Sequence, residues 1–228
     1  MSEMFLVRHG QASYGGDEYD RLSTLGHQQA RWLGEYFKYR KLQFDQVICG
    51  GMVRHRETLE GISAGMGEPL ESRVVHEQWN EFDFESMIKA FLQQFPGQIP
   101  AADAPRSEFA GVLRNTLETW ADNKLEHQVP ETFDQFEQRV STALSMAMAA
   151  GREDRGSRVL VVSSGGAISM ALRQVLKTPP QTVVRMNLQT RNSSYSHLFF
   201  NEKGIHLSGF NHIPHLDHPD REQAVTYY

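Results

Sequence analysis

The sequence has one cysteine, no long apolar run and no excess of positive charge. Cys49 cannot form an intramolecular disulfide or a zinc site of paired cysteines, a pattern typical of proteins in a reducing compartment. No stretch approaches the roughly 18 continuous apolar residues of a membrane-spanning helix. Asp and Glu number 28 against 23 Lys and Arg, so we expect no general nucleic-acid-binding face. Any anion site must be local.

The rest of the composition is that of an ordinary globular chain. Its 228 residues, 39% of them hydrophobic, can bury the core of one domain. The opening "MSEM" leads directly into the strand-like "FLVR" and leaves no room for a secretory leader. We therefore expect a cytoplasmic protein that is not bound to a membrane, and we make no prediction of its oligomeric state.

Three segments each combine a short apolar strand, a loop and a helix. They comprise residues 4–41, 45–67 and 157–177. Buried strands that alternate with helices predict an α/β protein with a three-layer αβα fold and a mainly parallel sheet. Residues 191–211 predict two further strands around a turn at Asn201 to Gly204, antiparallel and at the sheet edge.

The region between the second and third units is less regular. Residues 84–130 contain helix-like pieces that the Pro- and Ala-rich stretch 96–105 separates. We therefore expect a single domain over residues 1–228, with an inserted helical subdomain at about 84–130 that lies over one end of the sheet. After this region, the spacing of Thr132 and Gln135 predicts a capping box at the start of a long helix.

Candidate site residues follow the three predicted strands. In an open α/β sheet, ligands bind beyond the carboxyl ends of the strands. Arg8 and His9 follow the first strand, Arg54 follows the second, and Ser163, Ser164, Gly165 and Gly166 follow the third. Two guanidinium groups, an imidazole, hydroxyls and glycine amides can surround a tetrahedral dianion, so the predicted ligand is a phosphoryl group.

Structural roles are the alternative for several of these residues. The glycine pair can serve only a tight turn, and the serine pair can serve as a helix N-cap. For His55 and Arg56, which directly follow Arg54, we expect a solvated helix face, although Arg56 could brace the phosphoryl site.

The motif "FLVRHGQAS" resembles the signature of the histidine phosphatase (phosphoglycerate mutase-like) superfamily. The resemblance continues in order through "LSTLGHQQA", "VICGGMVRHRET", "NEFDF", "PETFDQFEQRV" and "VLVVSSGGAI", and so covers most of residues 4 to 170. Only the Arg-His-Gly signature is specific by itself. The resemblance implies a doubly wound α/β fold and hydrolysis of a phosphoric monoester through a phosphohistidine, without a cofactor or metal.

The same resemblance implies roles for individual residues. His9 would be the nucleophile, and Glu81 would be the proton donor, with Asp83 or Glu85 as alternative acids. Arg8 and Arg54 would bind the phosphoryl oxygens during transfer. Further predicted contacts are Ser164 and Gly165 to the phosphate, and Gln11, Ser13 and Tyr14 to the rest of a small phosphorylated substrate.

The chain departs from the family pattern at one position. Most members have a second histidine, a donor to the transferring phosphoryl oxygen, where this chain has Ser164. Loss of such a donor costs on the order of a hundredfold in rate. Three hypotheses follow: a slow phosphatase in which Ser164 and glycine amides replace the donor, a phosphatase in which a C-terminal histidine (His212, His215 or His218) does so, or a non-catalytic phosphate-binding module.

Other functions fit the sequence less well. The stretch 85–105 lacks the arginine and tyrosine grouping that phosphoglycerate mutases use, and it favours a partly apolar leaving group. Such a group could contact Phe84, Met87, Phe91 and Phe95, although residues at that spacing are more often the buried face of a helix. "SSGG" matches only half of a serine-hydrolase nucleophile elbow. The C-terminal histidine cluster lacks a carboxylate motif and is a weak metal signal.

Overall fold

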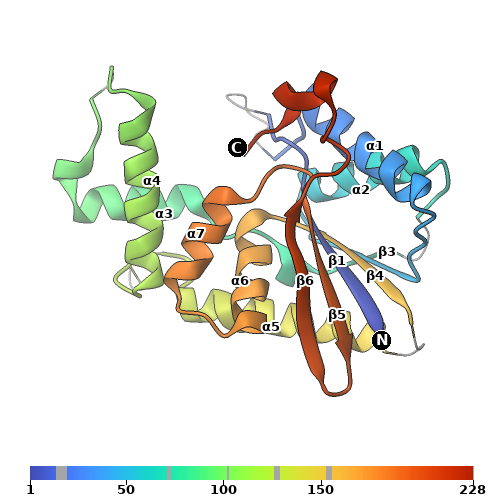
Figure 1. Cartoon of the computed structure of the whole chain (residues 1–228). Helices are drawn as coiled ribbons and strands as arrows, with labels where there is room; N and C mark the ends of the chain where they lie inside the picture. Colours follow the sequence, from blue (N-terminus) through green and yellow to red (C-terminus); the bar gives the residue numbers. More distant parts are fainter. Residues whose placement is uncertain (14–19, 71–72, 102, 126–128, 153–155, 228) are drawn as a thin grey trace.

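One six-stranded sheet organises the molecule (Figure 1). The structure is a computed structural model that describes residues 1–13, 20–70, 73–101, 103–125, 129–152 and 156–227. The strand order is β3-β2-β4-β1-β5-β6. The strands are β1 (Ser2–Arg8), β2 (Gln46–Cys49), β3 (Arg73–Val75), β4 (Arg158–Ser163), β5 (Tyr195–Asn201) and β6 (Gly204–His212).

Strands β1 to β4 are parallel to one another. Strand β5 is antiparallel to both of its neighbours, β1 and β6. The prediction of a mainly parallel sheet with an antiparallel edge is therefore confirmed. The edge consists of the hairpin β5-β6, whose turn lies at Asn201 to Gly204 as expected. The short strand β3, which extends the opposite edge, was not predicted because its three residues are all exposed.

Helices cover both faces of the sheet. They are α1 (Thr24–Tyr39), α2 (Val53–Met66), α3 (Phe84–Gln94), α4 (Arg106–Ala121), α5 (Phe133–Ala150), α6 (Gly165–Leu176) and α7 (Gln181–Gln189), with short 3-10 turns η1 (Glu77–Trp79), η2 (Pro96–Gln98) and η3 (Pro219–Ala224). No helix in these described ranges is long and apolar enough to cross a bilayer.

Alternating residues of the central strands build two separate cores. Met4 and Leu6 of β1 pack with residues of α5 and α6, whereas Phe5 and Val7 pack with residues of α1 and α2. Successive side chains of a strand point to opposite faces, so a strand covered on both sides must be apolar throughout. This packing explains the continuous hydrophobic run at residues 159–162.

Local signals set several helix ends. The Ser23 hydroxyl accepts from Gly26 N at 3.0 Å at the start of α1. The capping box of α5 is confirmed, because Thr132 N donates to Gln135 Oε1 at 2.9 Å and Gln135 N donates to Thr132 Oγ1 at 3.2 Å. At the other end of a helix, Gly67 terminates α2 in the left-handed conformation, with φ of 74°.

The helices α3 and α4 lie outside the sheet layers. Figure 1 shows them beyond α7, on the side away from α1 and α2. Met87 and Phe91 of α3 and Leu117 and Trp120 of α4 are buried in the same core as α5. A second wall thus stands apart from the carboxyl ends of the strands, and a cavity lies between the two.

Candidate active site

The sheet register brings the three predicted strand ends side by side. Arg8 pairs with Ser163 across β1 and β4, and Cys49 pairs with Val162 across β2 and β4. The ladder continues one residue further, because His9 N donates to Ser163 O at 2.9 Å and Gly50 N donates to Val162 O at 3.0 Å. The residues after each strand therefore start from one edge.

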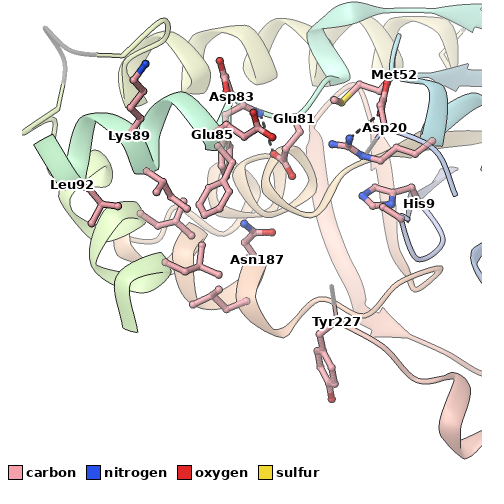
Figure 2. A pocket seen from close by; sticks show the side chains of 18 of the residues that line it. His9, Asp20, Met52, Glu81, Asp83, Glu85, Lys89, Leu92, Asn187 and Tyr227 are labelled. Atoms are coloured by element: carbon pink, nitrogen blue, oxygen red, sulfur yellow. Dashed lines mark hydrogen bonds and ion pairs between the residues drawn. The ribbon is translucent and has the colours of Figure 1, made fainter. Parts of the chain in front are cut away.

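His9 is buried at the wall of the cavity (Figure 2). Its Nδ1 lies 2.7 Å from the carbonyl oxygen of Gly10, so Nδ1 of a neutral ring carries the proton. Burial lowers the pKa of His9 well below its ordinary value, and the positive charges of Arg54 and Arg8 lower it further. The ring is thus neutral, with the lone pair on Nε2.

Two guanidinium groups share this wall. Arg8 Nη1 donates to the carbonyl oxygen of Thr190. Arg54, only 6% exposed, donates from Nη1 to Asp20 Oδ1 at 2.9 Å and from Nη2 to Ser164 Oγ at 3.4 Å. Its buried Nε has no hydrogen-bond partner among the residues described. An unpartnered N–H on a buried cation suits an incoming anion.

Asp20, which the sequence did not single out, positions Arg54. Besides its ion pair with the guanidinium, its Oδ2 accepts from Val53 N at 2.8 Å, at the first residue of α2. The carboxylate therefore ties the start of the helix and the side chain of Arg54 to the first loop. Nothing in the sequence marked Asp20, because its partners are more than 30 residues away.

Glu81 approaches the start of α6 closely. Its Oε2 accepts from Gly166 N at 2.9 Å, and its Oε1 accepts from Phe82 N at 3.3 Å. Burial raises the pKa of Glu81, although the Gly166 amide and the charges of Arg54 and Arg8 oppose the rise. A Cβ on Gly166 would lie 2.2 Å from Glu81 Oε1, so the close approach requires glycine there.

The two alternative acids, Asp83 and Glu85, have different surroundings. Asp83 caps α3, accepting from the backbone N and hydroxyl of Ser86 at 3.0 and 2.6 Å. Glu85 is exposed in the first turn of the same helix. Both line the cavity, but only Glu81 is bonded to the start of α6 beside the predicted phosphate contacts.

The cavity has a volume of about 1410 Å³ and two unlike ends. Figure 2 shows His9 and Asp20 at one end, Leu92 and Lys89 at the other, and Glu81 and Asn187 between them. The far end is largely apolar and is lined by Phe84, Ile88, Leu92, Pro96, Ile99, Leu113, Leu117 and Leu188.

Of the four α3-region side chains proposed for a leaving group, only Phe84 lines the cavity. Met87 and Phe91 are buried in the core, and Phe95 is exposed. The helix places residues 84, 88 and 92 on one face and residues 87 and 91 on another, so the cavity takes the first face and the core takes the second. The leaving-group prediction was therefore wrong for Met87, Phe91 and Phe95, and the alternative, the buried face of a helix, is confirmed for Met87 and Phe91.

The expectation of a solvated face at His55 was also wrong. His55 is 0% exposed, and its Nε2 lies 2.7 Å from Ser164 Oγ. Its ring centroid lies 5.9 Å from that of His9. A Cβ on Gly50 would lie 2.1 Å from His55 Nδ1, so glycine leaves the space that the ring occupies. Arg56, by contrast, is exposed, with its Nη1 on Gly51 O.

The C-terminal histidines do not take the place of the missing imidazole, so that hypothesis was wrong. His215 is buried but holds Ser193 Oγ at 2.7 Å, and His212 and His218 are exposed; none lines the described wall of the cavity. The C-terminal segment does return to the site, where Tyr227 contributes to the wall. In the described ranges no group of three or more His, Cys, Asp or Glu side chains could hold a metal ion.

The remaining predicted contacts lie at different depths. Gln11 Oε1 accepts from Ser23 Oγ at 2.9 Å, and Ser13 Oγ donates to Leu22 O at 3.1 Å, so both side chains bond within the first loop rather than line the cavity. Tyr14 lies outside the described residues. Ser164 is fully buried, and neither Ser164 nor Gly165 lines the described cavity wall. A Cβ on Gly165 would lie 2.5 Å from Asn187 Oδ1. Their substrate contacts stay predictions.

The sequence is similar to known phosphatases. The profile described as Histidine phosphatase superfamily (branch 1) matches residues 4–213. A broad-specificity phosphatase of Saccharomyces cerevisiae is 24% identical over 179 residues, which cover 75% of this chain and 68% of that protein.

Solved structures share the fold at low identity. The phosphoserine phosphatase of Entamoeba histolytica superposes with a TM-score of 0.65 at 16% identity, covering 95% of this chain and 100% of that one. A phosphoglycerate mutase of Bacillus anthracis gives 0.67 at 16% identity, with 94% of each chain covered. The profile match over nearly the whole sequence shows that the chain belongs to the histidine phosphatase superfamily.

Proposed function

We propose that this protein hydrolyses phosphoric monoesters through a phosphohistidine at His9. The observation that carries the proposal is the placement of His9, Arg54 and Glu81 on one cavity wall. Among the residues described, the three side chains are a neutral imidazole whose Nδ1 faces the Gly10 carbonyl, a buried guanidinium whose Nε has no hydrogen-bond partner, and a carboxyl with a raised pKa. They meet the requirements for a nucleophile, an oxyanion clamp and a general acid.

In the first step His9 Nε2 attacks phosphorus and the ester P–O bond breaks. The Nδ1 proton stays on the ring and donates a hydrogen bond to Gly10 O, so the phosphorylated ring carries a positive charge. Glu81 gives its proton to the departing alkoxide, which leaves as an alcohol. Arg8 and Arg54 offset the charge that builds on the phosphoryl oxygens.

In the second step water attacks the phosphohistidine and the P–N bond breaks. Glu81, now a carboxylate, takes a proton from that water, and inorganic phosphate leaves. His9 and Glu81 return to their starting protonation states. The raised pKa of Glu81 supports its use first as an acid and then as a base.

A hydrolase fits the cavity better than a mutase or a pure phosphate receptor. The cationic side chains on its described wall are Arg8, Arg54 and Lys89, and Lys89 stands at the apolar end (Figure 2). This wall does not supply a cationic cluster for a second phosphate and a carboxylate. A receptor, for its part, needs no carboxyl with a raised pKa beside the bound anion.

The apolar end of the cavity supports a substrate class. We propose monoesters whose alcohol carries an apolar aliphatic or aromatic part, which would contact Ile88, Leu92 and Leu117. Each buried methylene contributes about 0.8 kcal/mol, so kcat/KM should rise roughly threefold to fourfold per added carbon in a series of alkyl phosphates. The predicted helical subdomain at 84–130 would then act as the part that selects the substrate.

Hydrolysis of 4-nitrophenyl phosphate by the wild type and by His9→Ala tests the proposal. We expect kcat of the variant to fall by roughly 10⁴-fold or more, because the covalent route is lost. His206→Ala is the matched control, since His206 is exposed on β6 and far from the cavity wall. Undiminished hydrolysis by His9→Ala would overturn the proposal, as would a wild type inactive on both aryl and alkyl phosphates.

A further inference from the structure

A second buried imidazole lies behind the phosphate site, and the hydrolytic cycle described above does not use it. His55 Nε2 contacts Ser164 Oγ at 2.7 Å, and the same hydroxyl oxygen lies 3.4 Å from Arg54 Nη2. In the described part of the chain, His55 Nδ1 is buried without a hydrogen-bond partner. These contacts link His55 through one hydroxyl to a guanidinium of the site.

The surroundings of His55 keep its ring neutral. Burial lowers its pKa well below the ordinary value, and the charges of Arg54 and Arg56 lower it further. The neighbouring ring of His9 is neutral for the same reasons. A neutral imidazole has one N–H, and the position of that proton decides what Ser164 can do.

The hydrogen bonds favour the proton on Nε2. If Ser164 donated to Nε2, the proton on Nδ1 would be a buried donor without an acceptor. If Nε2–H donates to Ser164 Oγ, only a lone pair on Nδ1 lacks a partner, and orphaned acceptors are tolerated better than orphaned N–H groups. The guanidinium of Arg54 can only donate, so Ser164 Oγ then accepts twice.

Ser164 is fully buried and does not line the described cavity wall, whereas Arg54, which it contacts, does. Ser164 stands at the start of α6, one residue beyond the strand end that pairs with His9. We propose that His55 is a positioning residue for phosphoryl transfer, one that fixes the Ser164 hydroxyl as an acceptor and so holds the Arg54 guanidinium that lines the cavity. This inference rests on the proposed phosphatase function and extends it to an imidazole supplied by α2.

The packing around Ser164 leaves no room for a longer side chain at position 164 while His55 is present. The His55 ring already lies in contact with Ser164 Oγ, and Gly50 provides the space on its other side. An imidazole at position 164 would therefore overlap the ring at position 55. The space holds one imidazole, either at position 55 or at position 164. Moving the ring from one position to the other is therefore a test.

The first test measures kcat on 4-nitrophenyl phosphate for His55→Ala, Ser164→Ala and the double variant. We expect each single variant to lose about 100-fold in kcat with a rise in KM of about fivefold, and the double variant to lose little more, because both remove the same support of Arg54. His55→Gln should keep most of the activity, since its amide N–H can donate to Ser164 without titrating. Its pH profile should match that of the wild type.

The second test exchanges the rings. Ser164→His alone should lose both activity and thermal stability through overpacking. His55→Ala combined with Ser164→His should recover at least about tenfold in kcat over His55→Ala. This exchange and His55→Gln keep the proposal testable if His55→Ala does not fold.

The matched control is His215→Gln. His215 is also buried and also holds a serine hydroxyl at 2.7 Å, but it does not line the described cavity wall. We expect it to change the unfolding temperature without changing kcat. Folded His55→Ala with wild-type kcat, additive losses in the double variant, or an acid-stable phosphoryl group on Ser164 would each overturn the proposal.

A readout without turnover separates this inference from the proposed function. If hydrolysis does not depend on His9, the phosphatase proposal fails by itself. Titration calorimetry with inorganic phosphate then decides the role of His55. Binding weakened at least about fivefold in His55→Ala but unchanged in His215→Gln supports positioning of the anion site, a difference of about 1 kcal/mol. Equal affinities overturn it.

Discussion

The two ends of the cavity are built in different ways. At the end that holds His9, the proposed phosphate end, side chains that follow the strand ends are held by directed hydrogen bonds, such as those of Arg54 to Asp20 and of Glu81 to Gly166. At the apolar end, α3, α4 and α7 contribute hydrophobic side chains such as Leu92, Leu113 and Leu188. Directed bonds fix atomic positions, whereas apolar contact depends mainly on buried area. Changes at the first end should alter the chemistry, and changes at the second should alter only the selection of substrate.

The largest loss of kcat should come from substitution of Glu81 and not of the other carboxyls near it. Glu81→Gln should lower kcat by about 10²- to 10⁴-fold, because the general acid is lost. Asp83→Asn keeps the cap of α3 and should change kcat by less than about threefold. Steady-state rates on an alkyl phosphate, whose leaving group needs the proton, provide the measurement. Equal losses in both variants would mean that the acid has been misassigned.

The same variants give a pH test. His9 must be neutral, and its pKa is lowered, so kcat/KM should rise with pH through a value below 6.5. Glu81 must be protonated, and its pKa is raised, so kcat/KM should fall as pH rises through a value above 4.5. Glu81→Gln should remove the falling limb and leave the rising one. A falling limb that persists in this variant would contradict the assignment.

A smaller effect should come from one methyl group at the phosphate end. Gly166→Ala would place a Cβ 2.2 Å from Glu81 Oε1 and 2.4 Å from Phe82 Cε1, which must displace the acid. We expect kcat to fall roughly 10- to 100-fold, since a shift of about 1 Å can cost that much. Gly111→Ala in α4 is the control, because a Cβ there meets nothing within 4 Å. It should leave kcat unchanged and stabilise the fold by about 0.5–1 kcal/mol.

The smallest effect should come from the apolar end. Leu92→Ser should lower kcat/KM about fivefold to tenfold for an aryl or long alkyl phosphate, because apolar contact area is lost. Hydrolysis of glycerol phosphate, which cannot reach that wall, should be unchanged. Leu176→Ser, at an exposed leucine of α6, is the control. Equal losses on both substrates would show that Leu92 supports the fold rather than selection.

Much of the architecture could be predicted from local patterns. The apolar run at 158–163 is β4, and Thr132 with Gln135 caps α5. The residues that were missed depend on distant partners. Asn187 and Leu188 line the cavity from α7, a short helix that was not predicted and whose cap is Pro180. His55 was expected in solvent because arginines flank it, yet the first turn of α2 points it at Ser164.

The sequence alone determined most of the elements, the mainly parallel sheet and the gathering of Arg8, His9 and Arg54 at one edge, because periodicity is a local property and the carboxyl ends of parallel strands share an edge. Only the tertiary structure decided which groups surround the proposed phosphate site. Asp20 pairs with Arg54 and His55 contacts Ser164 across 34 and 109 positions of the chain. Such contacts depend on how α2 and α6 pack beside β4, and no spacing in the sequence encodes that packing.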